Sequence, residues 1–288
     1  FPFDLTREMA EEEGLSVDEA GFRALMEEQR SRARAARGNI SGWSDTSRSA
    51  LENVQKTDFV GYDRESCEAR VIAIVSENDL VDAVSEGECS LVLDTTVSYG
   101  EGGGQVGDCG KLFSDGLDAK VTDTKKTDGV YIHTAEILSG AVKVGDTVSA
   151  GVCATRRAQI KRNHSSVHLL QAALRKVLGD HVEQAGSFQD SERTRFDFSH
   201  FSAMTPEELK KVEDMVNAKI AEAVPVVTEV MTVDEAKKTG AMALFGEKYG
   251  ETVRVVKMGD FSTELCGGTH VANTGAIMAF KIVSESGV

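Results

Sequence analysis

Hydrophobic positions recur at two different spacings along the first half of the chain. From residue 5 to residue 36 apolar side chains return at helical intervals among Glu, Ala and Arg, and Ser16 before Asp18 and Glu19 is typical of a helix cap. We therefore predict a pair of helices, whose charged stretch at 27–37 is more typical of a solvated face than of a binding surface. Beyond a polar stretch, β-type runs separated by Gly, Asp and Ser predict a small antiparallel barrel of about a hundred residues. The runs are residues 70–75, 90–97, 119–122, 130–134 and 147–152.

The last third of the chain shows both spacings. A helical pattern runs through Val167, Leu170, Leu174 and Leu178 to a stop at Gly179, and a second helix at 206–223 follows Thr205 as its cap. Strands are expected at 194–198, 226–231 and 253–258. The fold class is therefore α+β, and the changes of texture predict three domains, at residues 1–54, 55–154 and 155–288.

Charge and composition narrow the possible partners. The formal net charge is −15 over 288 residues, which argues against nonspecific coating of nucleic acid, so a polynucleotide must meet a local basic patch. The candidate patch is Arg156, Arg157, Lys161 and Arg162, with Arg193 and Arg195, although ordinary surface charge explains these residues equally well.

The apolar runs and the cysteines of the sequence indicate its compartment. No apolar run approaches the roughly 20 residues of a membrane span, and no basic and apolar leader begins the chain, so we expect a cytoplasmic protein without a membrane partner. The start at Phe1 suggests a piece of a larger protein. Five scattered cysteines without a CxxC pair favour reduced thiols over a disulfide framework.

Two histidine-containing motifs carry the chemistry. His164 and His168 are four residues apart in a predicted helix. Their imidazoles therefore lie on the same face of the helix, about 6 Å apart, and can bind one metal ion. Zinc peptidases place a general-base Glu directly after the first His, and Ser165 in that position argues against a metallopeptidase. Such a pair alone occurs equally well in helices that bind no metal.

A second pair strengthens the metal interpretation. Cys266 and His270 are separated by Gly-Gly-Thr, a loop that can fold a thiolate and an imidazole toward one point. Two such pairs in a chain with only six histidines predict one zinc site formed by His164, His168, Cys266 and His270. The remaining histidines, His133, His181 and His200, are explained by structural roles.

The glycine-rich segment EGGGQVGD at 101–108 is a weak signal by itself. Successive glycines serve a tight turn as well as a phosphate cradle, and the Lys-Ser/Thr of a nucleotide P-loop does not follow. We therefore reject a nucleotide-binding loop.

Four motifs in register resemble the editing region of bacterial-type alanyl-tRNA synthetases. They are NHSSVHLL at 163–170, RFDFSH at 195–200, GAMALFGEKY at 240–249 and ELCGGTH at 264–270. Upstream, the 102–108 loop resembles that family's barrel domain, while FPFDLT at 1–6 and EEQR at 27–30 resemble the end of its tRNA-recognition region. Free-standing alanyl editing proteins and threonyl-tRNA synthetases share the zinc motifs, but the helical start and the 240–249 string favour the synthetase family.

The resemblance implies a fold and an activity. It implies a helical end of the tRNA-recognition region, a glycine-loop barrel and a zinc-binding editing domain that hydrolyses the ester of Ser-tRNA(Ala) or Gly-tRNA(Ala). Zinc would lower the pKa of a bound water or hold the substrate's amino group, and both remain open. The implied site residues are Gln184 and Cys266 as catalytic, Gly103, Gly104, Gln105, Arg162 and Arg195 as contacts of the substrate or the tRNA acceptor end, and His164, His168, Cys266 and His270 as zinc ligands.

Several features set limits to that implication. Val167, residues 97–100 and residues 276–278 depart from the family pattern. The class II aminoacylation motifs are missing from the sequence, so we expect neither an ATP site nor tRNA charging. Four protein ligands fill a tetrahedral site and leave no position open for water or substrate. Zinc sites that are closed in this way are usually structural. A non-catalytic tRNA-binding module with a structural zinc is therefore the alternative, and His164, His168 and Cys266 are the ligands given most weight.

Overall fold

The computed structural model describes residues 3–26, 28, 51, 54–77, 79–240 and 251–287. It divides into two compact units, residues 1–53 and 54–288, which are described separately. The predictions for residues 29–49 and 241–249 lie outside the described residues. The predicted division at 154/155 stays a prediction.

The first unit contains the predicted helix pair. Helix α1 spans Phe3–Glu12, and residues 19–26 form a second helical segment after a turn at Gly14. The cap of the second segment is Asp18, whose Oδ1 accepts a hydrogen bond from the Gly21 amide at 2.8 Å. The expectation of Ser16 as the cap was wrong, because the helix begins two residues later than that cap requires.

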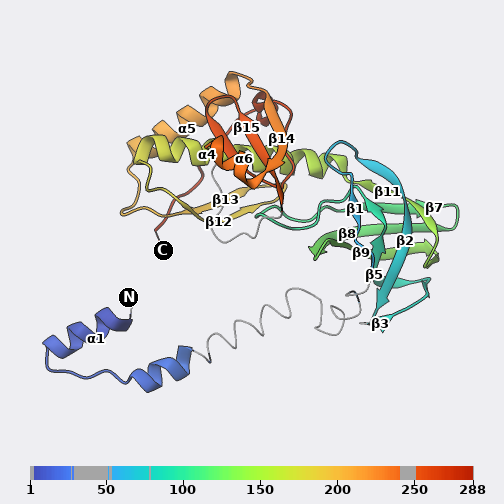
Figure 1. The fold of residues 1–288 in the computed structure, drawn as a ribbon, viewed down its shortest axis with the longest axis horizontal. Coiled ribbons are helices and arrows are strands. Elements are labelled where there is room, and N and C mark those ends of the chain that lie inside the picture. The colour runs from blue at the N-terminus through green and yellow to red at the C-terminus, as the bar shows by residue number, and fades with distance from the viewer. Residues whose placement is uncertain are drawn as a thin grey trace. The chain divides into compact units, whose positions relative to one another are not determined.

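The second unit begins with a closed barrel of six antiparallel strands, at the right of Figure 1. The strand order is β11-β7-β8-β9-β5-β2, and β2 pairs again with β11, which closes the sheet. These strands are β2 (Ser66–Ser76), β5 (Gly87–Leu93), β7 (Gly110–Ser114), β8 (Leu117–Thr127), β9 (Val130–Gly140) and β11 (Thr147–Val152). Short pairings add β1 (Asp58–Phe59), β3 (Asp79–Leu80), β4 (Ala83–Val84), β6 (Thr95–Thr96) and β10 (Val142–Lys143).

The predicted barrel is confirmed, with one strand missed by the sequence pattern. Strand β7 has a single buried side chain, Leu112, so it shows no alternation that a pattern search would detect. The other five strands bury alternate aliphatic residues in one core. His133 lies fully buried in β9, where Leu91 O and Thr96 Oγ1 satisfy its two nitrogens, and burial lowers its pKa to about 4.

The rest of this unit contains a two-stranded sheet and a separate three-stranded sheet between helices. One face of the sheet, with Val256 and Met258, packs with α4 and α5, and the other face, with Val253 and Val255, packs on α6. The elements are α4 (Ala154–Leu178), β12 (Gln184–Gln189), β13 (Thr194–Phe198), α5 (Pro206–Ala221), β14 (Val226–Thr232), α6 (Val233–Lys238), β15 (Thr252–Met258), β16 (Ser262–Leu265) and η1 (Thr274–Ile277). Thr205 caps α5 as predicted, through a capping box with Glu208.

Helix α4 joins the barrel to this sheet, and Figure 1 shows it running from the barrel edge into the C-terminal layer. Its residue Arg157 is 1% exposed and forms an ion pair with Asp108, which is equally buried. The Arg157 guanidinium also donates to Gly61 O at 2.8 Å and to Val97 O at 2.7 Å. Arg157 therefore cannot belong to an RNA-contacting surface, and its inclusion in the predicted basic patch was wrong.

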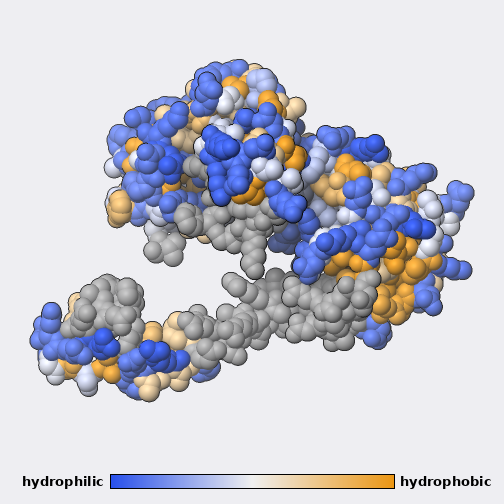
Figure 2. Space-filling view, in the orientation of Figure 1, coloured by the Kyte–Doolittle hydropathy of each residue, from blue (hydrophilic) through white to orange (hydrophobic). Residues whose placement is uncertain are grey.

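The surface of the second unit is mostly hydrophilic in the view of Figure 2, with hydrophobic side chains gathered over part of the barrel. Exposed apolar residues of the barrel strands include Leu80, Phe113 and Leu138, each about half exposed. Within the part of the chain that the structure describes, no helix is both long enough and apolar enough to cross a bilayer.

We predict that Arg157→Met destabilises the second unit by about 3–5 kcal/mol, because it leaves the Asp108 carboxylate buried without its cation. Urea unfolding of the metal-free protein, followed by circular dichroism, measures the change. Arg70→Met is the matched control, since Arg70 is an exposed barrel residue 4.0 Å from Asp94, and should cost less than about 1 kcal/mol. Equal midpoints for the two variants would contradict the prediction.

Candidate metal centre

Helix α4 presents two histidines on one buried face. His164 and His168 are each 4% exposed, and their rings stack at a centroid distance of 5.5 Å. One helical turn separates them, as the four-residue spacing predicts. The helix therefore supplies two parallel imidazoles that point to the same side.

Strand β16 and the loop after it supply the other half of the cluster. Side chains alternate across a strand, so Glu264 and Cys266 lie on the sheet face that packs against α4, while Leu265 packs on the α6 side. The chain then turns through Gly267 and Gly268 and brings His270 back toward Cys266.

The turn depends on glycine at one of these two positions. A Cβ atom added to Gly268 would lie 2.1 Å from Cε1 of His164, whereas a Cβ on Gly267 would meet nothing within 4 Å. The close approach of the Gly268 backbone is therefore what lets the loop close over the first imidazole.

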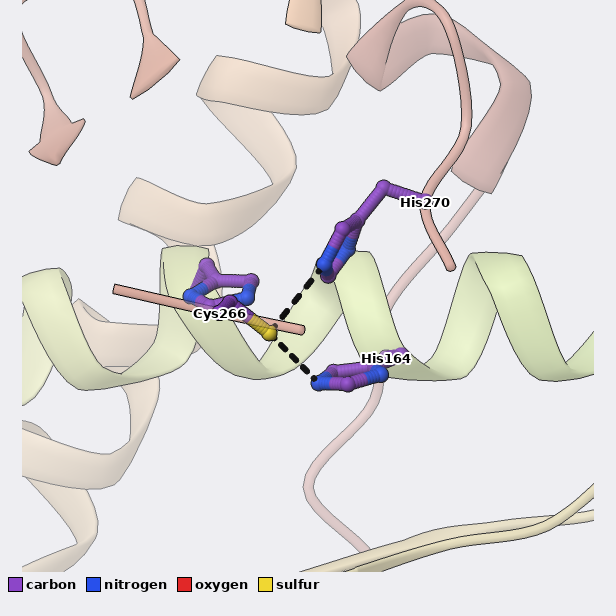
Figure 3. A group of neighbouring side chains, drawn as sticks. His164, Cys266 and His270 are labelled. Carbon is purple, nitrogen blue, oxygen red and sulfur yellow. Dashed lines mark hydrogen bonds between the residues drawn. The ribbon is translucent and has the colours of Figure 1, made fainter. Parts of the chain in front are cut away.

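Four donor atoms converge in this place. The ligand atoms of His164, His168, Cys266 and His270 all lie within 4.8 Å of one another. Cys266 Sγ is 3.4 Å from His164 Nε2 and 3.3 Å from His270 Nε2, the two contacts drawn in Figure 3. In tetrahedral zinc sites with Zn–S near 2.3 Å and Zn–N near 2.0–2.1 Å, sulfur and nitrogen ligands are about 3.5 Å apart. These separations fit a metal ion of that size.

Each imidazole in the cluster has its second nitrogen held by a protein partner. The Nδ1 pairs and their distances are His164 with Gln105 Oε1 at 2.8 Å, His168 with Glu264 Oε2 at 2.5 Å, and His270 with Ser165 Oγ at 3.3 Å. His168 Nε2 is buried and finds no hydrogen-bond partner among the described residues. Metal-binding histidines have this arrangement, because a partner at Nδ1 fixes the tautomer that leaves Nε2 free for the ion.

The orientation of Gln105 is fixed by its surroundings. Its Oε1 accepts a hydrogen bond from the Thr269 backbone amide at 2.9 Å, and a backbone N–H can only donate. The same oxygen must therefore accept from Nδ1–H of His164, which assigns the His164 proton to Nδ1. The glycine-rich loop of the barrel thus orients a candidate ligand on α4.

Electrostatics favour the metal-binding protonation states of Cys266 and His270 and oppose that of His168. Burial by itself would raise the pKa of the Cys266 thiol, but the imidazoles of His164, His270 and His168 outweigh it and hold that pKa well below its usual value. Burial lowers the pKa of His270 to about 3, against an opposing contribution from Cys266. For His168 burial is outweighed by the Glu264 carboxylate, which raises the imidazole pKa well above its usual value, so a metal ion there must displace a proton.

Of the three predicted glycine-loop residues, Gln105 contacts the cluster. Gln105 is fully buried and contacts His164, while Gly103 is exposed and Gly104 partly buried, both with positive φ. The loop runs beside β12, since Gln189 N donates to Gly104 O at 2.8 Å. A substrate-binding role for these three residues stays a prediction.

The other predicted residues are not joined to the cluster by any hydrogen bond among the described residues. Gln184 is partly buried at the start of β12, where it pairs with Phe198 of β13. Arg195 is exposed in β13 beside Asp197, and Arg162 is partly buried on α4. Their catalytic and tRNA-contact roles stay predictions.

Three supporting residues were missed as partners of the cluster, or were given another role. Glu264 stands two positions before Cys266, and strand alternation would have placed the two side chains on one face. Ser165 was judged only as the residue that replaces a peptidase base. Gln105 was assigned to substrate, and nothing in its local sequence indicates a contact with a histidine 59 positions away.

Comparisons with known proteins agree with the motifs. A family model described as tRNA synthetases class II (A) matches residues 1–156, and one described as Threonyl and Alanyl tRNA synthetase second additional domain matches residues 253–288. An alanine–tRNA ligase 1 of Lachnoclostridium phytofermentans and an alanine–tRNA ligase of Acetivibrio thermocellus are each 52% identical over 292 residues. An alanine–tRNA ligase of Clostridioides difficile is 50% identical over 292 residues. Each alignment covers 100% of this chain and 33% of the relative, so the chain spans about a third of the length of the curated relatives it matches.

We predict that Gly268→Ala lowers the affinity for zinc at least about tenfold, because the new methyl group displaces His164. Competition with a chromophoric chelator measures the affinity. Gly267→Ala is the matched control one residue earlier, where a methyl group has open space. Closely similar affinities for the two variants would show that the loop adapts without moving the imidazole.

We also predict that Glu264→Gln weakens zinc binding by about 10- to 100-fold, since an amide is a poorer partner than a carboxylate for Nδ1–H of His168. The same chelator competition serves. The control is Glu229→Gln in β14, where the carboxylate pairs with Lys257 on the surface. An unchanged affinity in the Glu264 variant would mean that this hydrogen bond does not orient the ligand.

Proposed function

The chain belongs to the alanyl-tRNA synthetase family, and we propose that it edits mischarged tRNA(Ala) by hydrolysing the ester of Ser-tRNA(Ala) or Gly-tRNA(Ala). The observation that carries the proposal is the convergence of four ligand atoms, from one cysteine and three histidines. Each of the three imidazoles also has a protein partner at Nδ1. The second-additional-domain match at 253–288 includes Cys266 and His270 and supports the same assignment.

We assign the metal to His164, His168, Cys266 and His270, and zinc is the ion whose preferences this set of one thiolate and three imidazoles meets. Bound there, zinc would lower the pKa of a water molecule or hold the substrate's amino group during hydrolysis of the ester. The chain's own contribution is positional, since Gln105 and Glu264 hold His164 and His168 with the proton on Nδ1, and Ser165 contacts Nδ1 of His270.

Hydrolysis places a hydroxyl on the acyl carbon and a proton on the departing ribose oxygen. Gln184 is our candidate for hydrogen bonds to the aminoacyl ester, because an amide both donates and accepts. A pocket that hydrogen-bonds the serine hydroxyl would leave buried polar groups unpaired when alanine enters, which spares the correct product. This logic does not extend to glycine.

The proposed partner is the acceptor end of tRNA(Ala). The net charge of −15 confines any such contact to local cationic surface. After Arg157 is removed, the candidate cations are Arg156, Lys161, Arg162, Arg193 and Arg195, of which Arg162 and Arg195 are our first choices. In this proposal the editing region at 155–288 acts within a longer alanine–tRNA ligase, with the barrel at 55–154 supporting it.

One observation favours a second function. The four donors would complete a tetrahedral shell by themselves, and such closed sites are usually structural. A tRNA-binding module with a structural zinc predicts tight metal and RNA binding without ester hydrolysis.

The deciding measurement is release of serine from Ser-tRNA(Ala), compared with release of alanine from Ala-tRNA(Ala). We expect selective release of serine, and a loss of at least about 100-fold in Cys266→Ala because one donor of the cluster is gone. The tRNA affinity of the variant, measured separately by filter binding, should change little. Bound zinc and bound tRNA with no serine release in the unmodified protein would establish the structural module instead.

A further inference from the structure

A cationic side chain lies next to the metal cluster and takes no part in it. Arg254 belongs to β15, and its backbone oxygen accepts a hydrogen bond from the Cys266 amide at 3.0 Å. Residues that face each other across antiparallel strands project to the same side of the sheet, so the Arg254 side chain lies on the Cys266 side. This is the face that packs against α4 and carries the cluster.

An aromatic ring from the barrel side holds the Arg254 guanidinium in place. Its central carbon is 3.2 Å from the ring centroid of Tyr62, which is a stacked cation–π contact. The Tyr62 hydroxyl donates to Gly267 O at 2.7 Å, within the loop that joins Cys266 to His270. Tyr62 thereby links the cation to the metal-binding loop and restricts the orientations of both.

The guanidinium lies where an anion is the expected neighbour. Arg254 is partly buried, and its Nε is buried without a hydrogen-bond partner among residues 54–77, 79–240 and 251–287. The same described residues offer it no carboxylate within ion-pair distance. A stacked guanidinium keeps its planar fork of donors available at the ring edge, and that fork matches the oxygens of a phosphate.

The chemistry of the proposed substrate identifies the anion. An aminoacyl ester carries a positive amino group and an uncharged ester, so the negative charge closest to the scissile bond is the phosphate on the 5′ side of the same terminal nucleoside. When the ester lies at the cluster, one ribose separates it from that phosphate. This separation is comparable to the length of an arginine side chain, so Arg254 beside the cluster can reach the phosphate. We propose that Arg254, held by Tyr62, binds this terminal phosphate and so positions the ester at the metal centre. The inference rests on the proposed editing function.

The test compares two minimal substrates that differ only in the phosphate. Serine esterified to the ribose of 5′-AMP carries it, and serine esterified to adenosine does not. In the zinc-loaded protein, Arg254→Gln should raise KM for the AMP ester about 10- to 100-fold and leave KM for the adenosine ester unchanged. Arg254→Lys should recover only part of the loss, because an ammonium lacks the planar fork.

A matched control separates this role from general charge and from damage to the fold. Lys257→Gln removes a cation from the same strand on the opposite face, where it pairs with Glu229. It should leave both KM values unchanged. Zinc content measured for every variant shows whether the cluster is intact.

Binding of 5′-AMP, measured by calorimetry against adenosine, provides a readout independent of hydrolysis. We expect the unmodified protein to prefer 5′-AMP and Arg254→Gln to lose that preference. Equal losses on both esters, or a preference unchanged in the variant, would overturn the proposal. If the unmodified protein hydrolyses neither ester but still shows the Arg254-dependent preference, the editing function fails and the phosphate site stands.

Discussion

The buried guanidinium of Arg157 is the contact on which the rest of the second unit depends. It ties the first turn of α4 to Asp108 and to two backbone oxygens, at Gly61 and Val97, with almost no exposure to solvent. Asp108 follows Gln105 by three residues in the glycine-rich loop. The ion pair that fixes α4 to the barrel therefore also sets where the loop meets the first histidine of the cluster.

This dependence makes the metal centre a product of the whole unit. Its three imidazoles are oriented by different elements: the barrel loop through Gln105, strand β16 through Glu264, and α4 itself through Ser165. Because a metal ion selects one tautomer of each ring, every element that holds an Nδ1 proton contributes to affinity. The barrel orients a candidate ligand without contributing one from its described residues, which gives a physical reason for its place beside the proposed editing site.

The sequence predicted contacts between residues that are close along the chain, and it missed contacts between residues that are far apart. The spacings of His164 with His168 and of Cys266 with His270 are local, so helix and loop geometry sufficed to form each pair, and the small number of histidines joined the two pairs into one site. Gln105 was assigned to substrate and Arg157 to a basic surface, because contacts across the barrel junction leave no periodic signal. Strand β7 was not predicted, because a strand with one buried residue shows no alternation of hydrophobic and polar positions.

Four protein ligands fill a tetrahedral site, whereas a hydrolytic site needs an open coordination position. This conflict becomes smaller when the contacts that hold each of the four donors are compared. His164 and His168 are buried in the middle of a long helix and held by short hydrogen bonds, and Cys266 follows a paired strand. His270 differs, because it follows two glycines and has the longest Nδ1 contact, 3.3 Å to Ser165. Three donors are thus rigidly built and one is carried by a loop. An uneven set of this kind is compatible with a coordination position that opens to substrate, which an evenly supported tetrahedron is not.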